Sequence, residues 1–199
     1  IAVCHNIKPN KPEYMRGKEM VIKGIADKTS GRLLGAQIVG YEGVDKRIDV
    51  FVTAITFKAK VEDLFHLDLA YAPPFSTTKD PVMYTGMILE NAIHRGRPLM
   101  TAQELDALMQ SDERYTLIDT RAAAQYEKNH VDTAKSIPHA ELRSAAESLD
   151  KDAVTITYCN KGTTGNAAQN ILLGRGFKKV YNLSGGQKQY SVTHKERTL

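Results

Sequence analysis

The 199-residue sequence has little of three features that would each indicate a particular class of protein. Its two cysteines, Cys4 and Cys159, are too few for a disulfide framework and lie too far apart for a C-x-x-C metal site. No apolar run approaches the roughly 18 residues of a membrane-spanning helix. Lys and Arg are scattered rather than clustered, which argues against a nucleic-acid partner. We therefore expect a cytoplasmic protein with no membrane or nucleic-acid partner and no metal site.

The composition is that of an ordinary globular protein, with 42% hydrophobic residues, 25% charged residues and a net charge of +4. The chain is long enough for two small domains. It opens on Ile1 without the basic segment and apolar run of a secretory signal, and without an initiator methionine, so we expect a piece of a longer protein. Gly96 and Pro98 interrupt helical structure. We place one domain over residues 1–92, a linker over 93–98 and a second domain over 99–199.

The first domain is predicted to be α+β with an antiparallel sheet. Residues 20–25 and 33–39 have the character of strands, and the polar turn at 27–31 joins them as a hairpin. Apolar residues recur with a helical period over 43–57. A second helix is expected from Asp80-Pro81, because proline is favoured at the first helical position.

The second domain is predicted to be α/β, with a parallel sheet flanked by helices, because its strands and helices alternate. Thr101 and Glu104 form a capping box that starts a helix extending to Met109. The remaining elements expected from the pattern are strands at 115–118, 134–137, 154–158 and 179–182 and helices at 122–128 and 165–175. Reactive groups in such sheets lie beyond the carboxyl ends of the strands.

Cys159 directly follows the buried strand 154–158 and precedes a helix. The intervening loop is Asn160-Lys161-Gly162-Thr163-Thr164-Gly165. Amides of a tight loop and of a helix N-terminus converge at such a position and favour an anion, which for cysteine is the nucleophilic thiolate. Gly162 and Gly165 would let the loop curl inward. The alternative is that Cys159 is a small buried hydrophobic residue with no chemical role.

Several segments of the second domain resemble rhodaneses in the right order over about a hundred residues. They are Leu117-Ile-Asp-Thr-Arg121, Gln125-Tyr126, His130-Val131, Ser136-Ile-Pro138, Tyr158-Cys-Asn-Lys-Gly162, Gly176-Phe177, Val180-Tyr-Asn-Leu183 and Gly185-Gly186. The resemblance implies that Cys159 is catalytic, carries a persulfide and passes its sulfur to another thiol, and that residues 160–165 bind the substrate. It also implies that Asp119, Arg121 and His130 belong to the structural framework.

One departure from the rhodanese pattern bears on the substrate. Many rhodaneses have arginine at the fifth position after the cysteine, where Thr164 stands here. Losing a guanidinium that binds an oxyanion through two hydrogen bonds makes thiosulfate a poor donor, so a polysulfide or a persulfide such as that of coenzyme A is expected. It also leaves open a catalytically inert dimerisation and docking module. A phosphatase loop would need an arginine that is absent until Arg175.

The first domain resembles the dimerisation domain of pyridine nucleotide-disulfide oxidoreductases, in particular coenzyme A-disulfide reductases. The resemblance rests on Gly31–Gly40, Gly43–Asp49 and Leu69-Ala-Tyr-Ala-Pro-Pro-Phe-Ser76. It implies a homodimer in which Tyr71 and Tyr14 reach the partner's active site as catalytic groups. Simple packing of Tyr71 and a surface turn at Tyr14 are the alternatives.

The whole of such an enzyme would use FAD and NAD(P)H, and possibly coenzyme A. No G-x-G-x-x-G lies between a strand and a helix here, so we predict that this chain binds no cofactor itself. Cys4 has no recognisable motif beside it and is predicted to be structural. The sequence is thus interpreted as part of a flavin-dependent coenzyme A-disulfide, polysulfide or persulfide reductase, carrying a rhodanese sulfurtransferase site.

Overall fold

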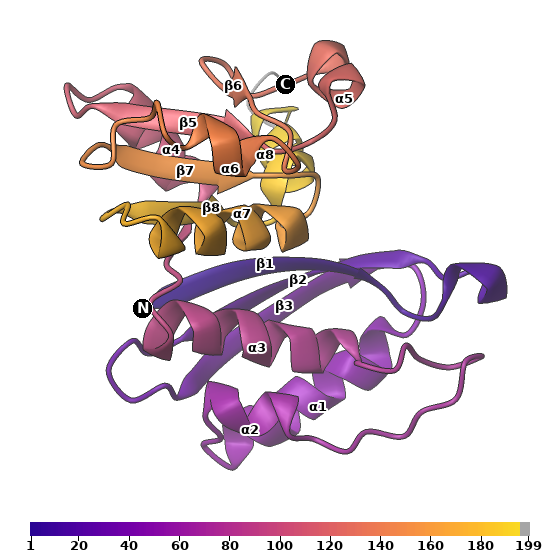
Figure 1. Cartoon of the computed structure of the whole chain (residues 1–199). Coiled ribbons are helices and arrows are strands. Elements are labelled where there is room, and N and C mark those ends of the chain that lie inside the picture. Colours follow the sequence, from indigo (N-terminus) through magenta and orange to yellow (C-terminus); the bar gives the residue numbers. More distant parts are fainter. Residues whose placement is uncertain (196–199) are drawn as a thin grey trace. The chain divides into compact units, whose positions relative to one another are not determined.

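The computed structural model describes residues 1–195 and divides the chain into two compact units, one spanning Ile1–Gly96 and the other beginning at Arg97. Each unit has its own sheet and its own buried core (Figure 1). No helix among the described residues combines the length and the apolar character that crossing a membrane requires.

The first unit has a three-stranded antiparallel sheet in the order β1-β2-β3, in which β2 and β3 form the predicted hairpin. Its elements are β1 (Ala2–Pro9), a 3-10 turn (Glu13–Met15), β2 (Glu19–Ala26), β3 (Leu33–Gly40), α1 (Val44–Thr56), α2 (Val61–Phe65) and α3 (Pro81–His94). The sequence pattern did not predict β1 or α2. In β1, the buried position Asn6 breaks the apolar alternation, and its amide donates to Pro81 O and Thr85 Oγ1 of α3.

The core of this unit lies between the sheet and its helices (Figure 1). Ile22, Phe51 and Leu89 are fully buried there, each from a different element. The helices α2 and α3 approach each other closely at Gly86, where an added Cβ would lie 2.6 Å from the Leu64 Cβ. Close packing of this kind leaves no room for a larger side chain at that position.

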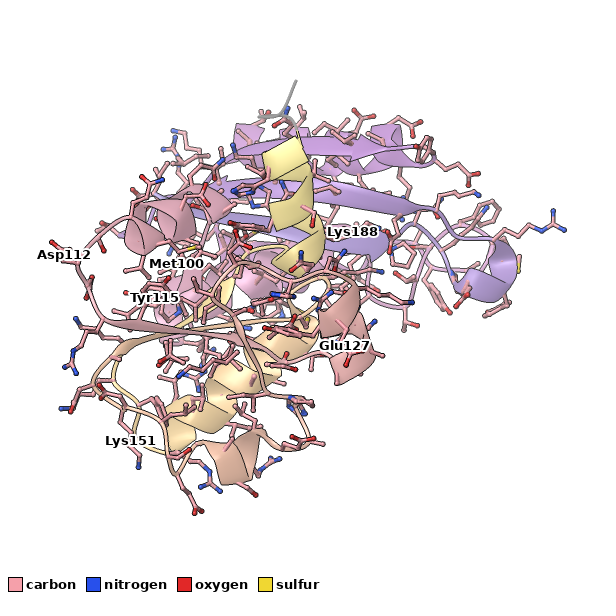
Figure 2. The ribbon with its side chains drawn as sticks, turned by 90° about the horizontal axis from the view of Figure 1, so that it is seen from above. Met100, Asp112, Tyr115, Glu127, Lys151 and Lys188 are labelled. Carbon is pink, nitrogen blue, oxygen red and sulfur yellow. The ribbon has the colours of Figure 1, made fainter. Side chains whose placement is uncertain are left out.

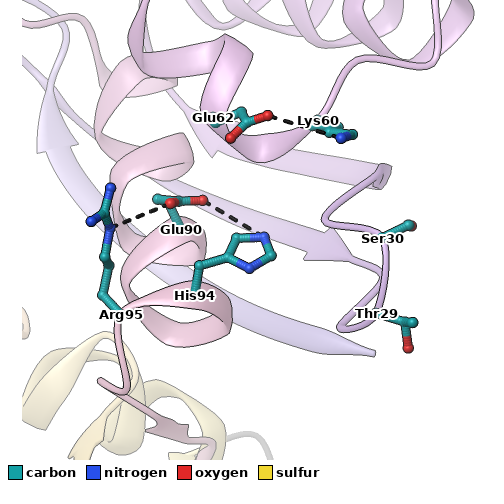
Figure 3. Close-up of a pocket in the computed structure, with 7 residues that line it drawn as sticks. All are labelled: Thr29, Ser30, Lys60, Glu62, Glu90, His94 and Arg95. Atoms are coloured by element: carbon teal, nitrogen blue, oxygen red, sulfur yellow. Dashed lines mark ion pairs between the residues drawn. The ribbon is translucent and has the colours of Figure 1, made fainter.

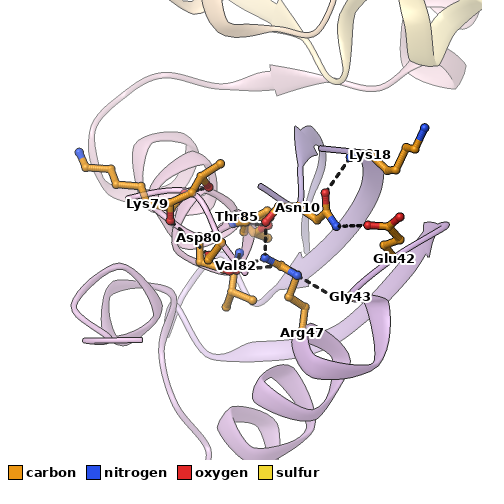
Figure 4. A network of polar contacts seen from close by, with 12 residues as sticks. Asn10, Lys18, Glu42, Gly43, Arg47, Lys79, Asp80, Val82 and Thr85 are labelled. Carbon is orange, nitrogen blue, oxygen red and sulfur yellow. Dashed lines mark hydrogen bonds and ion pairs between the residues drawn. The ribbon is translucent and has the colours of Figure 1, made fainter. Parts of the chain in front are cut away.

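A buried ion pair joins α1 to the start of α3 (Figure 4). Arg47 donates from Nη2 to Asp80 Oδ2 at 2.8 Å and from Nε to Asp80 Oδ1 at 3.2 Å. The same guanidinium donates to Gly43 O and to Asn10 O, at the end of β1. Asp80 also caps α3 by accepting from the Val82 N–H. Both charges are therefore almost fully hydrogen-bonded, which is the condition for tolerating buried ions.

The second unit has a five-stranded parallel sheet in the order β4-β8-β7-β5-β6, confirming the predicted α/β class. Figure 2 shows it from above, with Met100 marking β4, Tyr115 marking β5 and Lys188 marking α8. Its elements are β4 (Leu99–Met100), α4 (Ala102–Met109), β5 (Tyr115–Asp119), α5 (Ala123–Lys128), β6 (Lys135–Ser136), α6 (Leu142–Ala145), β7 (Val154–Tyr158), α7 (Thr163–Gly174), β8 (Val180–Leu183) and α8 (Gly186–Lys195).

Two apolar clusters make up the core of this sheet. One contains Leu105 of α4 with Ile156 of β7, and the other contains Leu172 of α7 with Ile118 of β5. Because neighbouring residues of a strand point to opposite faces, a strand covered on both faces is buried at every position. All five residues of β7 are accordingly buried, which places the strand that leads to Cys159 at the centre of the unit.

We predict that Asp80→Asn destabilises the first unit by about 3–5 kcal/mol, because it leaves the buried Arg47 cation without a counter-charge. Urea unfolding followed by circular dichroism measures the loss. The matched control is Glu62→Gln, in the exposed pair with Lys60, which should leave the unfolding midpoint unchanged. A loss for Asp80→Asn below about 1 kcal/mol would contradict this account of the pair.

Candidate functional site

The loop after β7 turns one of its own amides back onto the cysteine sulfur. Cys159 is the first residue after the strand and is 7% exposed. The Gly162 N–H donates to Cys159 Sγ at 3.2 Å. Gly162 has a φ of 98°, a conformation that favours glycine, and it is the N-cap of α7. The sulfur therefore lies beside an N–H donor at the start of a 12-residue helix, a position that stabilises an anion.

A pocket of about 430 Å³ opens beside the sulfur. Two segments form it, the loop after β7 and the residues that follow β5, which is the neighbouring strand in the parallel sheet. Its lining residues are Thr120, Arg121, Ala122, Gln125, Cys159, Asn160, Lys161, Thr163 and Thr164. Hydroxyl, amide and cationic groups thus surround one thiol, a combination suited to a small anionic substrate.

Arg121 connects the two sides of this pocket. Its Nη2 donates to Asp119 Oδ2 at 2.6 Å and its Nη1 to Asn160 Oδ1 at 3.3 Å. Asp119 is fully buried. Burial opposes the charge of Arg121, but the hydrogen bond and the charge of Asp119 outweigh it and raise the pKa of the guanidinium. The sequence interpretation of Arg121 was structural only, and the structure adds a contact with the cysteine loop.

Hydrogen bonds from the residue that follows β5 hold the end of β7 in place. Thr120 donates to Tyr158 O through both its N–H, at 2.9 Å, and its Oγ1, at 2.7 Å. Tyr158 is fully buried, and burial raises the pKa of its phenol. Its hydroxyl accepts the Val131 N–H. Cys159 therefore starts from a backbone position that two hydrogen bonds hold in place.

The loop residues predicted to bind substrate have three different environments in the structure. Asn160, Lys161, Thr163 and Thr164 line the pocket. Gly162 supplies the amide that contacts the sulfur. Gly165 does not belong to the loop, because α7 starts at Thr163, two residues earlier than the pattern predicts. It lies buried in the first turn of that helix, where an added Cβ would come within 2.3 Å of Asn182 Oδ1.

Sequence reasoning missed two polar lining residues, Thr120 and Gln125. Both follow β5, whose carboxyl end lies beside that of β7. The rule that parallel strands bring their carboxyl ends together could have found them. His130 is not a lining residue of this pocket. Its ring stacks on Tyr126 and contacts the Tyr126 carbonyl.

The second cysteine has the opposite environment. Cys4 is completely buried in β1, and burial raises the pKa of its thiol to about 12. A thiol with such a pKa remains protonated near neutral pH and is a poor nucleophile. These two observations suit a structural residue and make Cys4 a natural control for the chemistry of Cys159.

The two tyrosines of the first unit are exposed. Tyr14 lies in the 3-10 turn and is 74% exposed, and Tyr71 lies in the irregular segment between α2 and α3 and is 49% exposed. The segment around Tyr71 contains Pro73 and Pro74, which cannot donate the backbone hydrogen bonds of a helix or a sheet. Both phenols are thus accessible to another chain.

A second pocket, of about 570 Å³, lies in the first unit (Figure 3). Its buried carboxylate, Glu90, lies 3.8 Å from His94 Nε2 and 3.5 Å from Arg95 Nε. Thr29, Ser30, Lys60 and Glu62 complete the lining. The pocket contains no thiol, and its buried charge is balanced by its own neighbours, so the Cys159 pocket is the better candidate for chemistry.

A cysteine at the carboxyl end of a central parallel strand, with a loop amide on its sulfur, is the arrangement expected of a rhodanese-type domain. Comparison with known families agrees: the rhodanese-like domain matches residues 101–193, and the pyridine nucleotide-disulphide oxidoreductase dimerisation domain matches residues 5–81. The chain belongs to the rhodanese family, with that dimerisation domain preceding the rhodanese domain. Both predicted resemblances, and the order of the two domain types, are confirmed.

Individual relatives cover different parts of the chain. The crystal structure of reduced Bacillus anthracis CoADR-RHD superposes on 98% of it with a TM-score of 0.91 and 34% identity. The CoA-dependent NAD(P)H sulfur oxidoreductase of Pyrococcus furiosus is 43% identical over 86 residues, which are 42% of this chain. The thiosulfate sulfurtransferase GlpE of Coxiella burnetii is 31% identical over 78 residues, 39% of this chain and 73% of that protein.

The chain is much shorter than the relatives that share its first domain. It spans 35% of the Bacillus anthracis chain, and the matched segment is 19% of the Pyrococcus furiosus protein.

Proposed function

We propose that Cys159 is a sulfur carrier. Its thiolate attacks the outer sulfur of a donor persulfide, R–S–S⁻, forming an Sγ–S bond as the S–S bond of the donor breaks and R–S⁻ leaves. A second thiolate then attacks the outer sulfur of the Cys159 persulfide. The attacking thiolate takes that sulfur, and the Cys159 thiolate leaves. Each step exchanges one sulfur–sulfur bond for another, so no external oxidant or reductant is needed.

The hydrogen bond from the Gly162 N–H to Cys159 Sγ carries this proposal. It favours the thiolate, which is both the attacking group and the leaving group of the two steps. The pocket beside Sγ has room for the second sulfur, and Thr163, Thr164 and Asn160 surround it with polar groups. These residues are proposed to bind the substrate together with Lys161 and Gly162.

The donor is proposed to be a thiol-borne persulfide, such as that of coenzyme A, or a polysulfide. Thr164 lines the pocket where a guanidinium would be needed to bind a sulfonate through paired hydrogen bonds. The Arg121 guanidinium also lines it, but Asp119 already occupies Nε and Nη2. A single anionic sulfur needs fewer hydrogen-bond donors and less positive charge from this pocket than the sulfonate group of thiosulfate does.

We further propose that the chain works within a homodimeric, FAD-dependent coenzyme A-disulfide, polysulfide or persulfide reductase that uses NAD(P)H. In that assembly, Tyr71 and Tyr14 would be catalytic groups presented to the partner chain, since an exposed phenol can donate a proton or a hydrogen bond to a thiolate. Gly31, Gly35 and Gly40 belong to the β2–β3 hairpin and form no G-x-G-x-x-G turn, so the nucleotide-binding turns for the flavin are proposed to lie elsewhere in that enzyme. No step above uses the flavin.

The first prediction of this function concerns sulfur loading of Cys159. Wild-type protein treated with polysulfide should yield about one cyanide-labile sulfur per chain, and Cys159→Ser should yield none. Release of thiocyanate and the mass of the intact protein measure the bound sulfur. Cys4→Ser is the matched control and should load like wild type, because Cys4 is buried and protonated. Equal loading of Cys159→Ser and wild type would refute the mechanism.

The alternative, an inert dimerisation and docking module, is favoured by Thr164 alone. It predicts that wild type takes up no sulfur from polysulfide or from coenzyme A persulfide. The same loading experiment therefore separates the two functions.

The second prediction concerns donor choice. Thr164→Arg should raise kcat/KM for thiosulfate by roughly tenfold or more, because a charge-assisted hydrogen bond contributes about 1.5–3 kcal/mol. Steady-state thiocyanate formation measures the change. Thr164→Gln adds length without charge and should leave the thiosulfate value near that of wild type. A wild-type preference for thiosulfate over polysulfide would contradict the proposed donor.

The third prediction concerns association. The chain, of 22.1 kDa, should form a dimer at micromolar concentrations, because a dimerisation domain makes up its first half. Light scattering combined with size-exclusion chromatography measures the mass. A strict monomer over this concentration range would count against a dimer formed by this chain.

A further inference from the structure

The carbonyl groups of the cysteine loop are held from the side of β8 and α8. The Gln187 N–H donates to Cys159 O at 2.9 Å, and the Lys188 N–H donates to Asn160 O at 3.0 Å. The third contact comes from a side chain: Asn182 of β8 donates from Nδ2 to Gly162 O at 3.0 Å. Three of the four carbonyls between residues 159 and 162 are thus anchored on one side.

Anchoring a carbonyl also sets the direction of the next amide. In a planar trans peptide, the C=O of one residue and the N–H of the following residue point in opposite directions. The anchored carbonyls therefore turn the N–H groups of Asn160, Lys161 and Thr163 away from β8 and α8. These three residues line the pocket, whereas no described residue of β8 or α8 does. The amides accordingly face the side where the sulfur is transferred.

We propose that Asn182 is a positioning residue for sulfur transfer, an inference that rests on the proposed function of Cys159. The Gly162 carbonyl accepts two hydrogen bonds, one from the Asn166 N–H within α7 and one from Asn182 Nδ2, and Asn182 is the contact that ties this peptide, with its positive-φ glycine, to β8. The N–H of the same residue, Gly162, donates to Cys159 Sγ, so holding Gly162 in place also holds that contact. Asn182 acts through the loop and does not touch the sulfur substrate.

Asn182 is buried, and only one end of its amide group is hydrogen-bonded to the loop. The residue is 5% exposed, and its Oδ1 receives no hydrogen bond among the described residues. A buried polar atom without a partner is costly, and an apolar side chain of the same shape would avoid that cost. Gly165 has no side chain, which lets the first turn of α7 come close to Asn182 Oδ1. The Nδ2 donor is therefore the part of the side chain that the loop uses.

The test compares Asn182→Leu, which keeps the shape and removes the donor, with Asn182→Ala, which also relieves any crowding against α7. We expect both to form the Cys159 persulfide at least about tenfold more slowly and, in a fixed concentration of an added thiol that accepts the outer sulfur, to lose the persulfide at least about tenfold faster. Thiocyanate release after timed loading with polysulfide measures formation, and the half-life of the preformed persulfide measures its stability. Thermal unfolding by circular dichroism reports the fold.

Gln169→Leu is the matched control. Gln169 is a buried amide on α7 whose Nε2 donates to Pro98 O and Val180 O, and its Oε1 also receives no hydrogen bond among the described residues. It contacts none of the loop carbonyls described above, so its loss should lower the unfolding temperature without changing the half-life of the persulfide.

The outcomes separate the two claims. If wild type takes up sulfur and both Asn182 variants form and lose the persulfide at the wild-type rates, the positioning role is refuted and the sulfur-carrier function is not. An equal kinetic loss in Gln169→Leu would also overturn it, because the loss would then follow from general destabilisation. A wild-type protein that takes up no sulfur would refute the carrier function and the positioning role together.

Discussion

The hydrogen bond between the Gly162 amide and the Cys159 sulfur is the interaction on which the proposed chemistry of this chain depends. It exists because β7 ends at Tyr158, the backbone reverses at a glycine with φ of 98°, and α7 begins one residue later. The parallel sheet supplies the rest of the geometry. Neighbouring strands end at the same edge, so the residues after β5 form the opposite wall of the pocket.

Buried ion pairs perform similar structural tasks in the two units. Arg47 and Asp80 join two helices of the first unit, and Arg121 and Asp119 join β5 to the cysteine loop of the second. In each pair the remaining guanidinium donors reach backbone or side-chain oxygens, which offsets the cost of burying the charge. The difference is that Arg121 also lines a pocket, so it forms part of a candidate site as well as of the structural framework.

The sequence predicted those elements whose formation depends on residues close together in the chain. The β-branched residues of β7, the capping box of α4 and the proline that opens α3 can each be recognised within a few residues of sequence. The strand β1 was missed because Asn6 is buried by bonding to α3, 75 residues or more away. The helix α8 was missed because its glycine start is typical of a turn and its sequence is strongly polar.

The candidate site shows the same division. Cys159 and its loop were identifiable from one segment of sequence, because a strand, a tight turn and a helix follow one another there. The lining residue Gln125 and the support from Asn182 were not, since each depends on bringing separate strands together. A resemblance to rhodaneses could place Asn182 in a motif, but only the structure shows which carbonyl it holds.

The charges of the pocket constrain what it can carry. The Arg121 guanidinium gives Nε and Nη2 to Asp119, so its cation is already balanced by a carboxylate. In the proposed function, an anionic sulfur would be stabilised by the amides of the cysteine loop together with Lys161, which also lines the pocket. These groups can hold one compact charge, whereas a thiosulfate dianion would need an arginine to bind its sulfonate through paired hydrogen bonds. The proposed choice of donor and the proposed support of the loop by Asn182 therefore concern the same group of donors around Cys159.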